Sequence, residues 1–536
     1  MKIGDELSKI LRYFILCVLI LTMISCAEEP AATIETTTQE TTTAAPEPEI
    51  AALDIGELYE NTKSDNYGEV NKIIVGSEEN SDLMCDIQSH TSRNDKKIYL
   101  FLPCRVDTSN LIFTVKHADG KESGPYKMDF INETVKVMMK DVEYTVEVLQ
   151  SGIPSIQLKI NEDHGKFSAV NESGDQSVFA YGDFVLDVTD ELAAEKGWLT
   201  SYPSVEHDVS TPETMKIRGR GNWTWHQAKK PYQIKLEKKL DLLGMGKAKT
   251  WILLANVMDA SLLRNQLFYD LATDIGLMYS PKIQPVDLFI DGVYMGSYSL
   301  STKPEVDESR VNIDEFADFL LEFDHYAHEE IYTFKTKRGF PVTLHNQENL
   351  EGVRIAADII NKIETLVYNQ SSNDYAQYLD VASWAKYYWV QDLSRNNDTL
   401  IGSSYIYYVA DDEKLYAGPM WDMDNTLGIW GGGRNLKREG WHSREFGWFT
   451  ALIKHSDFAA EVDRLYLEGG VRELFDSLPD RVRDYEKYMS LSAEMNYLIH
   501  NREHFVPLDT TNYPEEVEYL QGFLGDRINW YKTKYK

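Results

Sequence analysis

Three aspartates and an asparagine in the second half of the chain are spaced in a way that could serve phosphoryl transfer. Asn397 and Asp398 precede the run SSYIYYV, and Asp422 and Asp424 follow the next run, LYAGPM. The two runs are short and joined by the polar turn ADDEK, which predicts a β-hairpin. Phosphoryl transfer requires a carboxylate at the acceptor hydroxyl and further oxygen ligands for magnesium. The alternative is that these residues only cap or turn a loop.

A basic segment at residues 216–249 is a second candidate site. The chain carries 54 Lys and Arg against 86 Asp and Glu, a formal net charge of −32, yet this segment holds ten cations and two acids. An acidic protein that concentrates cations in this way favours an anion site. Gly219 and Gly221 alternate with Arg218 and Arg220, so backbone N–H and guanidinium groups could both approach a phosphate. A solvated basic surface with a glycine turn is the alternative.

Regular elements are expected around the basic segment. The run PYQIKLE predicts a strand, and IQPVDLFI and VYMGSYSL, joined by Asp291-Gly292, predict a hairpin because Asp-Gly suits a type I′ turn. We predict Asp259 as the N-cap of a core helix that ends at Gly276, since apolar residues recur every four positions between them. Arg264 and Asn265 lie off this apolar stripe, so their side chains could either reach a functional site or lie at the surface.

Further elements are expected around the aspartates. FADFLLEF predicts a strand, and the segments Glu348–Asn369 and Asp380–Arg395 predict helices. The second helix ends directly before Asn396–Asp398, so a rigid element would present these residues. The tail, Asp457–Lys536, is expected to be mostly helical and structural.

Taken in order, these segments resemble the spore-coat-protein-H family, the CotH-like atypical protein kinases. The resemblance covers roughly Phe179 to Lys536, about two thirds of the chain, and many motifs in one order make it specific. It implies a kinase-like domain over residues 175–536 that binds ATP and magnesium, or manganese, and phosphorylates protein hydroxyls. The matching segments are RGRGN (218–222), KPYQIKL (230–236), WILLAN (251–256), LLRN (262–265), GVYMGSY (292–298), RVNI (310–313), FLLEFD (319–324), ND (397–398) and GPMWDMD (418–424).

The resemblance and the residue chemistry together assign roles to the acidic residues. We predict that Asp398 is the catalytic carboxylate that accepts or orients the acceptor hydroxyl. Asp422 is the predicted principal magnesium ligand, Asp424 a second ligand or its support, and Asn397 an auxiliary amide ligand. Glu322 could pair with the phosphate lysine or touch the metal, or it could simply belong to an acidic strand end with Asp324.

The basic segment receives the phosphate-binding roles. Lys235, in the strand after the glycine loop, is the predicted phosphate lysine, and Lys230 is the alternative. Trp223 and Trp225 are expected to pack in the core rather than to cover the purine. The loop residues predicted to contact phosphates are Arg218, Gly219, Arg220 and Gly221.

One position departs from the family pattern. The family usually runs Tyr-x-Leu-Thr-Glu-Lys after the hairpin strand, whereas this chain reads YSLSTK, which places Thr302 where the glutamate is expected. Loss of that acid could remove an ion pair or a nucleotide contact. The departure therefore allows a second hypothesis, a pseudokinase that binds nucleotide without transferring phosphate.

The N-terminus indicates export. Cations precede the apolar run YFILCVLILTMI, which is too short to span a bilayer comfortably and ends at Ser25-Cys26. We predict that residues 1–25 are a lipoprotein signal peptide and that Cys26 is lipidated, with an ordinary secretory signal or an uncleaved anchor as the alternatives. Residues 26–52, rich in Thr, Pro and Glu, predict a disordered linker. The expected location is the extracellular face of a bacterial cell membrane.

Residues 67–160 predict a small all-β domain that precedes the kinase-like domain, so the expected fold class is α+β. Its short β-branched runs, separated by polar turns, are typical of a sandwich, with an immunoglobulin-like type as one option. Cys85 and Cys104 fall here; a disulfide between them and two reduced thiols are both open. A spacer or a weak binding module is the expected role.

Three hypotheses therefore compete for the whole chain. They are an active lipid-anchored kinase with protein substrates, a pseudokinase, and a structural surface lipoprotein whose β-domain binds polysaccharide or peptide. The net charge of −32 argues against nucleic-acid binding because most phosphate contacts would be repelled.

Overall fold

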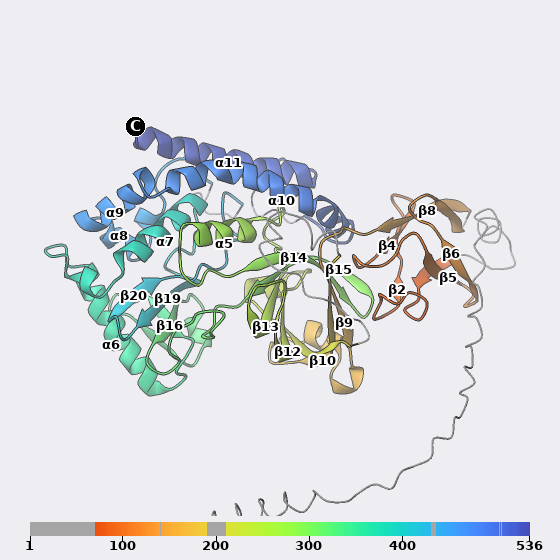
Figure 1. Ribbon diagram of the computed structural model, residues 1–536, viewed down its shortest axis with the longest axis horizontal. Coiled ribbons are helices and arrows are strands. Elements are labelled where there is room, and N and C mark those ends of the chain that lie inside the picture. Colours follow the sequence, from red (N-terminus) through yellow and green to blue (C-terminus); the bar gives the residue numbers. More distant parts are fainter. Residues whose placement is uncertain are drawn as a thin grey trace, which may run out of the picture. The chain divides into compact units, whose positions relative to one another are not determined.

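The computed structural model describes residues 70–139, 141–189, 211–429 and 436–536, except residues 503, 505 and 507. The predicted signal peptide, Cys26 and the predicted linker lie outside these residues. The described part of the chain is α+β, as expected (Figure 1). None of its helices is both long enough and apolar enough to cross a membrane.

The first described segment forms two four-stranded sheets. Inward-facing residues of both sheets share one hydrophobic cluster, which includes Ile73, Leu100, Val115 and Val137. The predicted all-β character is confirmed, whereas the immunoglobulin-like sandwich type stays a prediction. The first sheet has the order β2-β1-β5-β6 and the second β3-β4-β8-β7, with β1 (Val70–Val75), β2 (Ile87–Gln88), β3 (His90–Ser92), β4 (Lys97–Phe101), β5 (Leu111–His117), β6 (Glu122–Met128), β7 (Val135–Met139) and β8 (Val142–Leu149).

The two cysteines of this segment are free thiols. Cys104 is buried and Cys85 is partly buried. Burial raises the pKa of Cys104 to about 12 and that of Cys85 to about 11. Of the two alternatives left open by the sequence, the structure therefore contains the reduced pair.

Seven strands close into a barrel at the centre of the described chain (Figure 1). The strand predicted at Ile156–Ile160 forms, but it belongs to this barrel as β9, where it pairs with β10 and runs parallel to β14. The barrel thus begins inside the range predicted for the β-domain. Its order is β10-β11-β12-β13-β15-β14-β9, with β9 (Ser155–Ile160), β10 (Ala180–Asp187), β11 (Glu213–Gly219), β12 (Tyr232–Asp241), β13 (Lys247–Leu254), β14 (Ile283–Ile290) and β15 (Val293–Thr302).

The hairpin of β14 and β15 joins the barrel to the N-terminal sheets. Asp291 and Gly292 both have positive φ, +50° and +74°, as the predicted type I′ turn requires. Beyond the barrel, the ring of Tyr294 stacks on Phe101 at 4.7 Å between centroids. A Cβ added at Gly292 would lie 2.0 Å from the carbonyl oxygen of Asp86, so this contact depends on glycine. The N-terminal sheets are therefore packed against the barrel through a shared core.

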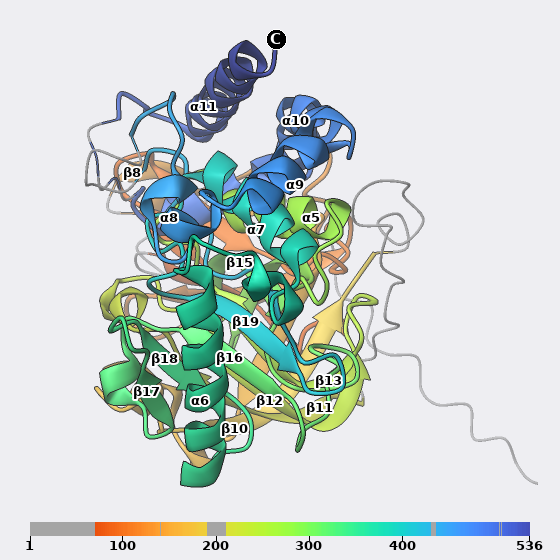
Figure 2. The same cartoon turned by 90° about the vertical axis from the view of Figure 1, so that its left-hand side faces the viewer.

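The remainder of the chain forms a five-stranded sheet covered by helices. Figure 2 shows α6 lying across this sheet. One large hydrophobic cluster joins the sheet to α5, α7 and the C-terminal helices. The sheet has the order β17-β18-β16-β19-β20, with β16 (Phe319–Phe323), β17 (Thr333–Lys335), β18 (Pro341–Leu344), β19 (Ser404–Val409) and β20 (Lys414–Ala417); the helices are α5 (Arg264–Asp274), α6 (Leu350–Val367), α7 (Val381–Ser394), α8 (Phe449–Leu452), α9 (Ser456–Leu467), α10 (Val471–Ile499) and α11 (Tyr513–Lys534).

Most helices begin and end close to the predicted residues. Asp380 caps α7, because its side chain accepts a hydrogen bond from the backbone N–H of Ser383. The predicted start of α5 at Asp259 is early: the helix begins at Arg264, and residues between them form a turn. The Asp259 carboxylate still accepts the Arg264 N–H at 2.8 Å, so it caps the helix from a distance.

The thiol pKa values predict very slow labelling of the native protein. With pKa values of about 11 and about 12, both cysteines are almost wholly protonated at pH 8, and only the thiolate reacts. Residues 53–536, treated with Ellman's reagent at pH 8, should release almost no thionitrobenzoate while folded and two equivalents in guanidinium chloride. Rapid native labelling, or no labelling after unfolding, would contradict the free buried thiols.

Candidate active site

The loop that carries Asp398 follows α7 directly. Arg395, at the C-terminus of that helix, has φ +54°, and Leu400 and Ser403 also have left-handed backbones. Residues other than glycine adopt this conformation at a cost in free energy, and such residues cluster at functional sites. The turn is closed by Asn396, whose side chain accepts the N–H of Asp398 at 3.0 Å.

The hairpin of β19 and β20 brings the two segments of aspartates together, as predicted. The charge of Asp398 raises the pKa of Asp422, after the larger effect of burial. Burial and the charge of Asp422 in turn raise the pKa of Asp424 well above its usual range. Burial also raises the pKa of Asp398. Asp422 therefore interacts with both Asp398 and Asp424, and the three carboxylates form one cluster.

Arg220 of the glycine loop faces this cluster from the barrel. Its charge lowers the pKa of both Asp422 and Asp424, against the effect of burial. Its guanidinium lies 5.5 Å from the ring centroid of Trp421, the residue before Asp422. The structure thus joins the predicted anion site to the predicted metal aspartates, which lie about 200 residues apart in sequence.

The glycines of this loop have a packing role. A Cβ added at Gly219 would lie 2.2 Å from the ring of Trp225, which is buried as expected. Gly221 has φ +85°, and its added Cβ would lie 2.5 Å from Oγ1 of Thr224. Trp223, in contrast, is 36% exposed, so the expectation that it packs in the core is wrong.

The remaining cations of the loop differ in their surroundings. Arg218 donates to the carbonyl of Gln176 and to the side chain of Gln233, at 3.2 and 3.3 Å. Lys230 donates to the carbonyl of Trp225 at 2.6 Å and lies over its ring. Lys235 is exposed on β12. Of the two predicted lysines, Lys235 is therefore the one not tied to a loop carbonyl.

A third lysine, which the sequence did not single out, lies near the loop. Burial lowers the pKa of Lys303, and the like charges of Arg218, Arg220 and Lys235 lower it further. Its closest acid is Glu305, at 3.8 Å. Its position directly after Thr302, in the segment that departs from the family pattern, was the available signal.

Glu322 faces the aspartates from β16. Its carboxylate accepts a hydrogen bond from Nε2 of His345 at 2.7 Å, and its charge contributes to the raised pKa of Asp422. The carboxylate of Asp324 instead accepts from the hydroxyl of Thr343 and the N–H of Tyr326. Glu322 thus lies at the cluster with His345 as its hydrogen-bond partner, whereas Asp324 closes a turn.

The amide side chain beside Asp398 belongs to a residue that sequence reasoning missed. Asn425 donates from Nδ2 to Oδ2 of Asp398 at 2.8 Å, and the charge of His325 also favours the ionised form of Asp398. Asn397, the predicted amide ligand, is partly buried in the preceding turn. The position of Asn425 directly after Asp424 was the only signal in the sequence.

The carboxylates and amides of the cluster are oxygen donors, as magnesium requires. In the described ranges, no group of three or more His, Cys, Asp or Glu side chains is arranged as a ready-made metal site. Asp398 and Asp422 nevertheless form a carboxylate pair, and magnesium in phosphoryl-transfer sites is held by one or two carboxylates plus waters and phosphates. These residues therefore fit a magnesium ion that binds together with a nucleotide.

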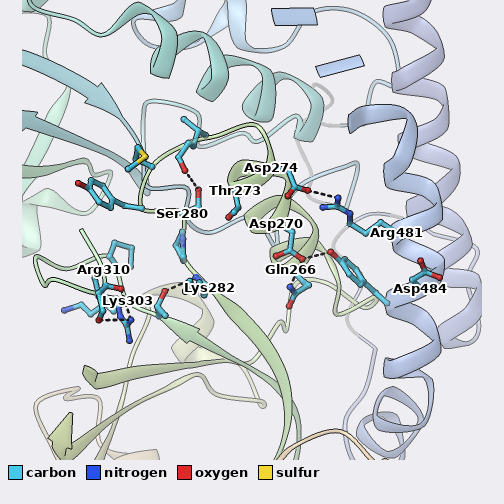
Figure 3. A pocket seen from close by; sticks show the side chains of 18 of the residues that line it. Gln266, Asp270, Thr273, Asp274, Ser280, Lys282, Lys303, Arg310, Arg481 and Asp484 are labelled. Atoms are coloured by element: carbon cyan, nitrogen blue, oxygen red, sulfur yellow. Dashed lines mark hydrogen bonds and ion pairs between the residues drawn. The ribbon is translucent and has the colours of Figure 1, made fainter. Parts of the chain in front are cut away.

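A large cavity lies between the C-terminal half of α5, the segment after β15 and α10 (Figure 3). Its volume is about 1010 Å³, and Lys282, Arg310, Asp274 and Arg481 are among its lining residues. None of the predicted site residues lines it, but Thr302 and Lys303 do. The cavity therefore reaches one of the loop cations, although it does not include the carboxylate cluster.

Comparison with known families decides the relationship of the chain. Residues 217–531 match the family model described as CotH kinase protein, which is more than half of the chain. The chain belongs to the CotH kinase protein family. The match begins in β11, so β9 and β10 of the barrel precede it, and it is shorter than the Phe179–Lys536 range of the predicted resemblance. A search of curated proteins found no match.

Membership of the CotH kinase family supports the kinase reading of the site. It implies an atypical protein kinase that uses ATP. The carboxylate cluster and the facing Arg220 both lie inside the matched residues.

Neutralising Asp424 should stabilise the protein. Burial and Asp422 raise its pKa in the folded state, so its ionised form opposes folding, and this penalty grows as the pH rises above about 4. We expect Asp424→Asn to increase the free energy of unfolding by about 1 kcal/mol at pH 7 and to raise Tm by about 1–3 °C. The gain should shrink towards pH 4.

Differential scanning calorimetry between pH 4 and pH 8 would measure this effect. Asp411→Asn, in the exposed hairpin turn, is the matched control and should leave Tm unchanged. A lower Tm for Asp424→Asn at pH 7 would show that the carboxylate stabilises its surroundings.

Gly219→Ala should destabilise the glycine loop through Trp225. The added methyl group would lie within 2.2 Å of the indole ring, and overpacking of this kind costs about 1–3 kcal/mol. A double variant with Trp225→Leu should recover part of the lost Tm. If the Tm losses of Trp225→Leu and Gly219→Ala simply added in the double variant, the packing role of Gly219 would be wrong.

Proposed function

We propose that this chain is an ATP- and magnesium-dependent protein kinase that phosphorylates Ser or Thr hydroxyls of secreted or cell-surface proteins. The observation that carries the proposal is the cluster of Asp398, Asp422 and Asp424 facing Arg220. Carboxylates that bind metal and orient a hydroxyl, opposed by an arginine that binds phosphate, are the parts that phosphoryl transfer requires.

Each residue has a distinct task in this proposal. Asp398 orients the acceptor hydroxyl and receives its proton while the hydroxyl oxygen bonds to the γ-phosphorus and the bond to the ADP oxygen breaks. Asp422 would hold a magnesium ion, and Asp424 would support Asp422. The bound metal would supply positive charge that offsets the charge of the phosphates.

The cations of the barrel complete the site. Arg220 binds phosphate oxygens, and its attraction to Asp422 keeps the glycine loop near the carboxylates. Lys235 and Lys303 are the two lysines available for phosphate contact, because Lys230 is engaged by Trp225. These cations repel one another, and a bound phosphate anion would reduce this repulsion, which favours its binding.

The location of this activity follows from the N-terminal sequence alone. A lipidated Cys26 and a Thr-, Pro- and Glu-rich linker would hold the kinase domain at the extracellular face of a bacterial membrane. Substrates would then be proteins exposed at or passing through that surface.

A pseudokinase is the second candidate, and one observation favours it. Thr302, at the position of the expected glutamate, is 4% exposed, and its hydroxyl accepts the N–H of Lys282 at 3.0 Å. The residue is thus part of the strand framework, and it carries no charge toward a nucleotide or a lysine. Loss of an acid here would remove an ion pair or a nucleotide contact, which supports a domain that does not transfer phosphate.

A transfer assay separates these functions. We expect residues 53–536 with γ-labelled ATP and magnesium to label casein or themselves, and Asp398→Ala and Asp422→Ala to lower the rate at least a hundredfold, because each removes a required group. Asp411→Ala, exposed on the hairpin turn, is the matched control and should keep the full rate.

Two other outcomes would decide against an active kinase. Absence of label, with ATP and magnesium still raising Tm, would establish the pseudokinase. Absence of both label and thermal shift would rule out nucleotide binding and leave a structural role for the domain.

A further inference from the structure

The first turns of α5 contact the loop that carries Asp422 and Asp424. Met423 donates its backbone N–H to Oδ1 of Asn265 at 2.8 Å, and Asp422 donates its N–H to the hydroxyl of Tyr269 at 3.2 Å. At the other end of the loop, Nε of Arg264 donates to the carbonyl of Thr426 at 3.0 Å. Side chains of one helix therefore hold both ends of residues 422–427.

This loop needs external support because its two ends are strained. Asp422 has φ +59° and Leu427 has φ +50°, both in the left-handed region. Such conformations persist where surrounding contacts enforce them. Repulsion of Asp422 by Asp398, and of Asp424 by Asp422, would also tend to separate these carboxylates if the backbone were free.

The anchoring side chains are themselves fixed. Nδ2 of Asn265 donates to Oδ1 of Asn256 at 3.1 Å, and Nδ2 of Asn256 donates to Ser299 of β15 at 2.8 Å. Arg264 forms an ion pair with Asp259, and both side chains are 1% exposed. A continuous set of buried polar contacts thus runs from the barrel strand β15 through α5 to the backbone of residues 422–427.

The far end of α5 is also held. Tyr485 of α10 donates to the carboxylate of Asp270, and Arg481 pairs with Asp274 at 2.6 Å, as Figure 3 shows. With anchors at both ends, α5 is a rigid support rather than a mobile one. Gln266 takes no part in the loop contacts; it donates to Asp270 at 2.7 Å.

We propose that Asn265, Arg264 and Tyr269 are positioning residues, which fix the backbone of residues 422–427 so that Asp422 stays in its left-handed conformation beside Asp398. Asn265 acts through a neutral hydrogen bond, so it constrains the carboxylates without changing the charge of the site. The expected effect of these residues on metal binding rests on the proposed function. Their constraint on the backbone of residues 422–427 does not depend on that function.

Hydrogen–deuterium exchange with mass spectrometry on residues 53–536 and on matched variants tests the constraint directly. Asn265→Ala should raise the amide exchange rate of residues 422–427 at least tenfold. Tyr269→Phe removes only one hydroxyl and keeps the ring packed on Trp421, so it should raise exchange at the start of the loop while the fold is kept. Gln266→Ala, the adjacent residue in α5 and similarly buried, is the control and should leave loop exchange unchanged.

The same variants provide a second measurement. In the transfer assay, Asn265→Ala should raise the magnesium concentration for half-maximal rate at least tenfold and lower kcat, with KM for the acceptor protein unchanged. A merely structural role would lower the amount of folded protein and leave the magnesium dependence of the remainder as in the wild type.

The outcomes separate the inference from the proposed function. Unchanged exchange of residues 422–427 in both Asn265→Ala and Tyr269→Phe would overturn the inference, whatever the activity. Faster exchange across the whole chain in Asn265→Ala would mean unfolding, and Tyr269→Phe alone would then decide. If the variants show the expected faster exchange of residues 422–427 but the wild-type protein transfers no phosphate, the positioning role is kept and the kinase activity is rejected.

Discussion

The structure around the candidate site depends on repulsion between carboxylates that must nevertheless stay together. Burial raises the pKa of Asp398, Asp422 and Asp424, and the charges of Asp398 on Asp422 and of Asp422 on Asp424 raise it further, which opposes ionisation unless a cation binds. Arg220 offsets part of this charge from the barrel, and α5 fixes the loop backbone. The closed barrel and the five-stranded sheet thus contribute different parts of one site.

The glycine-rich segment has two roles, an electrostatic one and a packing one, which the sequence alone does not separate. Arg220 reaches the carboxylates, but Gly219 makes room for the indole of Trp225, and Gly221 allows a left-handed turn. A phosphate would approach a loop whose shape is set by aromatic packing.

The N-terminal sheets and the barrel form a continuous structure. Phe289 and Tyr294 of the β14–β15 hairpin lie in the hydrophobic cluster of the N-terminal sheets, together with Met495 of α10. A segment with a shared core is held in place, so these sheets would extend the kinase domain rather than move independently beside it. Any binding role they have would act at a fixed position relative to the barrel.

Several features could be determined from the sequence because they depend on local chemistry. The type I′ turn at Asp291-Gly292, the cap of α7 by Asp380 and the hairpin that delivers Asp422 and Asp424 all follow from nearby residues. The order of the motifs was sufficient to predict the CotH kinase family, which the family match confirms.

Other features were decided by the tertiary structure, because they join residues far apart in sequence. Periodicity cannot show that β9 pairs with β14, that Glu322 faces Asp422, or that Lys303 lies among the loop cations. The start of α5 also moved to Arg264, since Asp259 is used to bind that arginine rather than to begin the helix. The polarity of Asn265 is compatible with the surface or with a site, and only the packing of α5 against residues 422–427 places its side chain on the backbone of that loop.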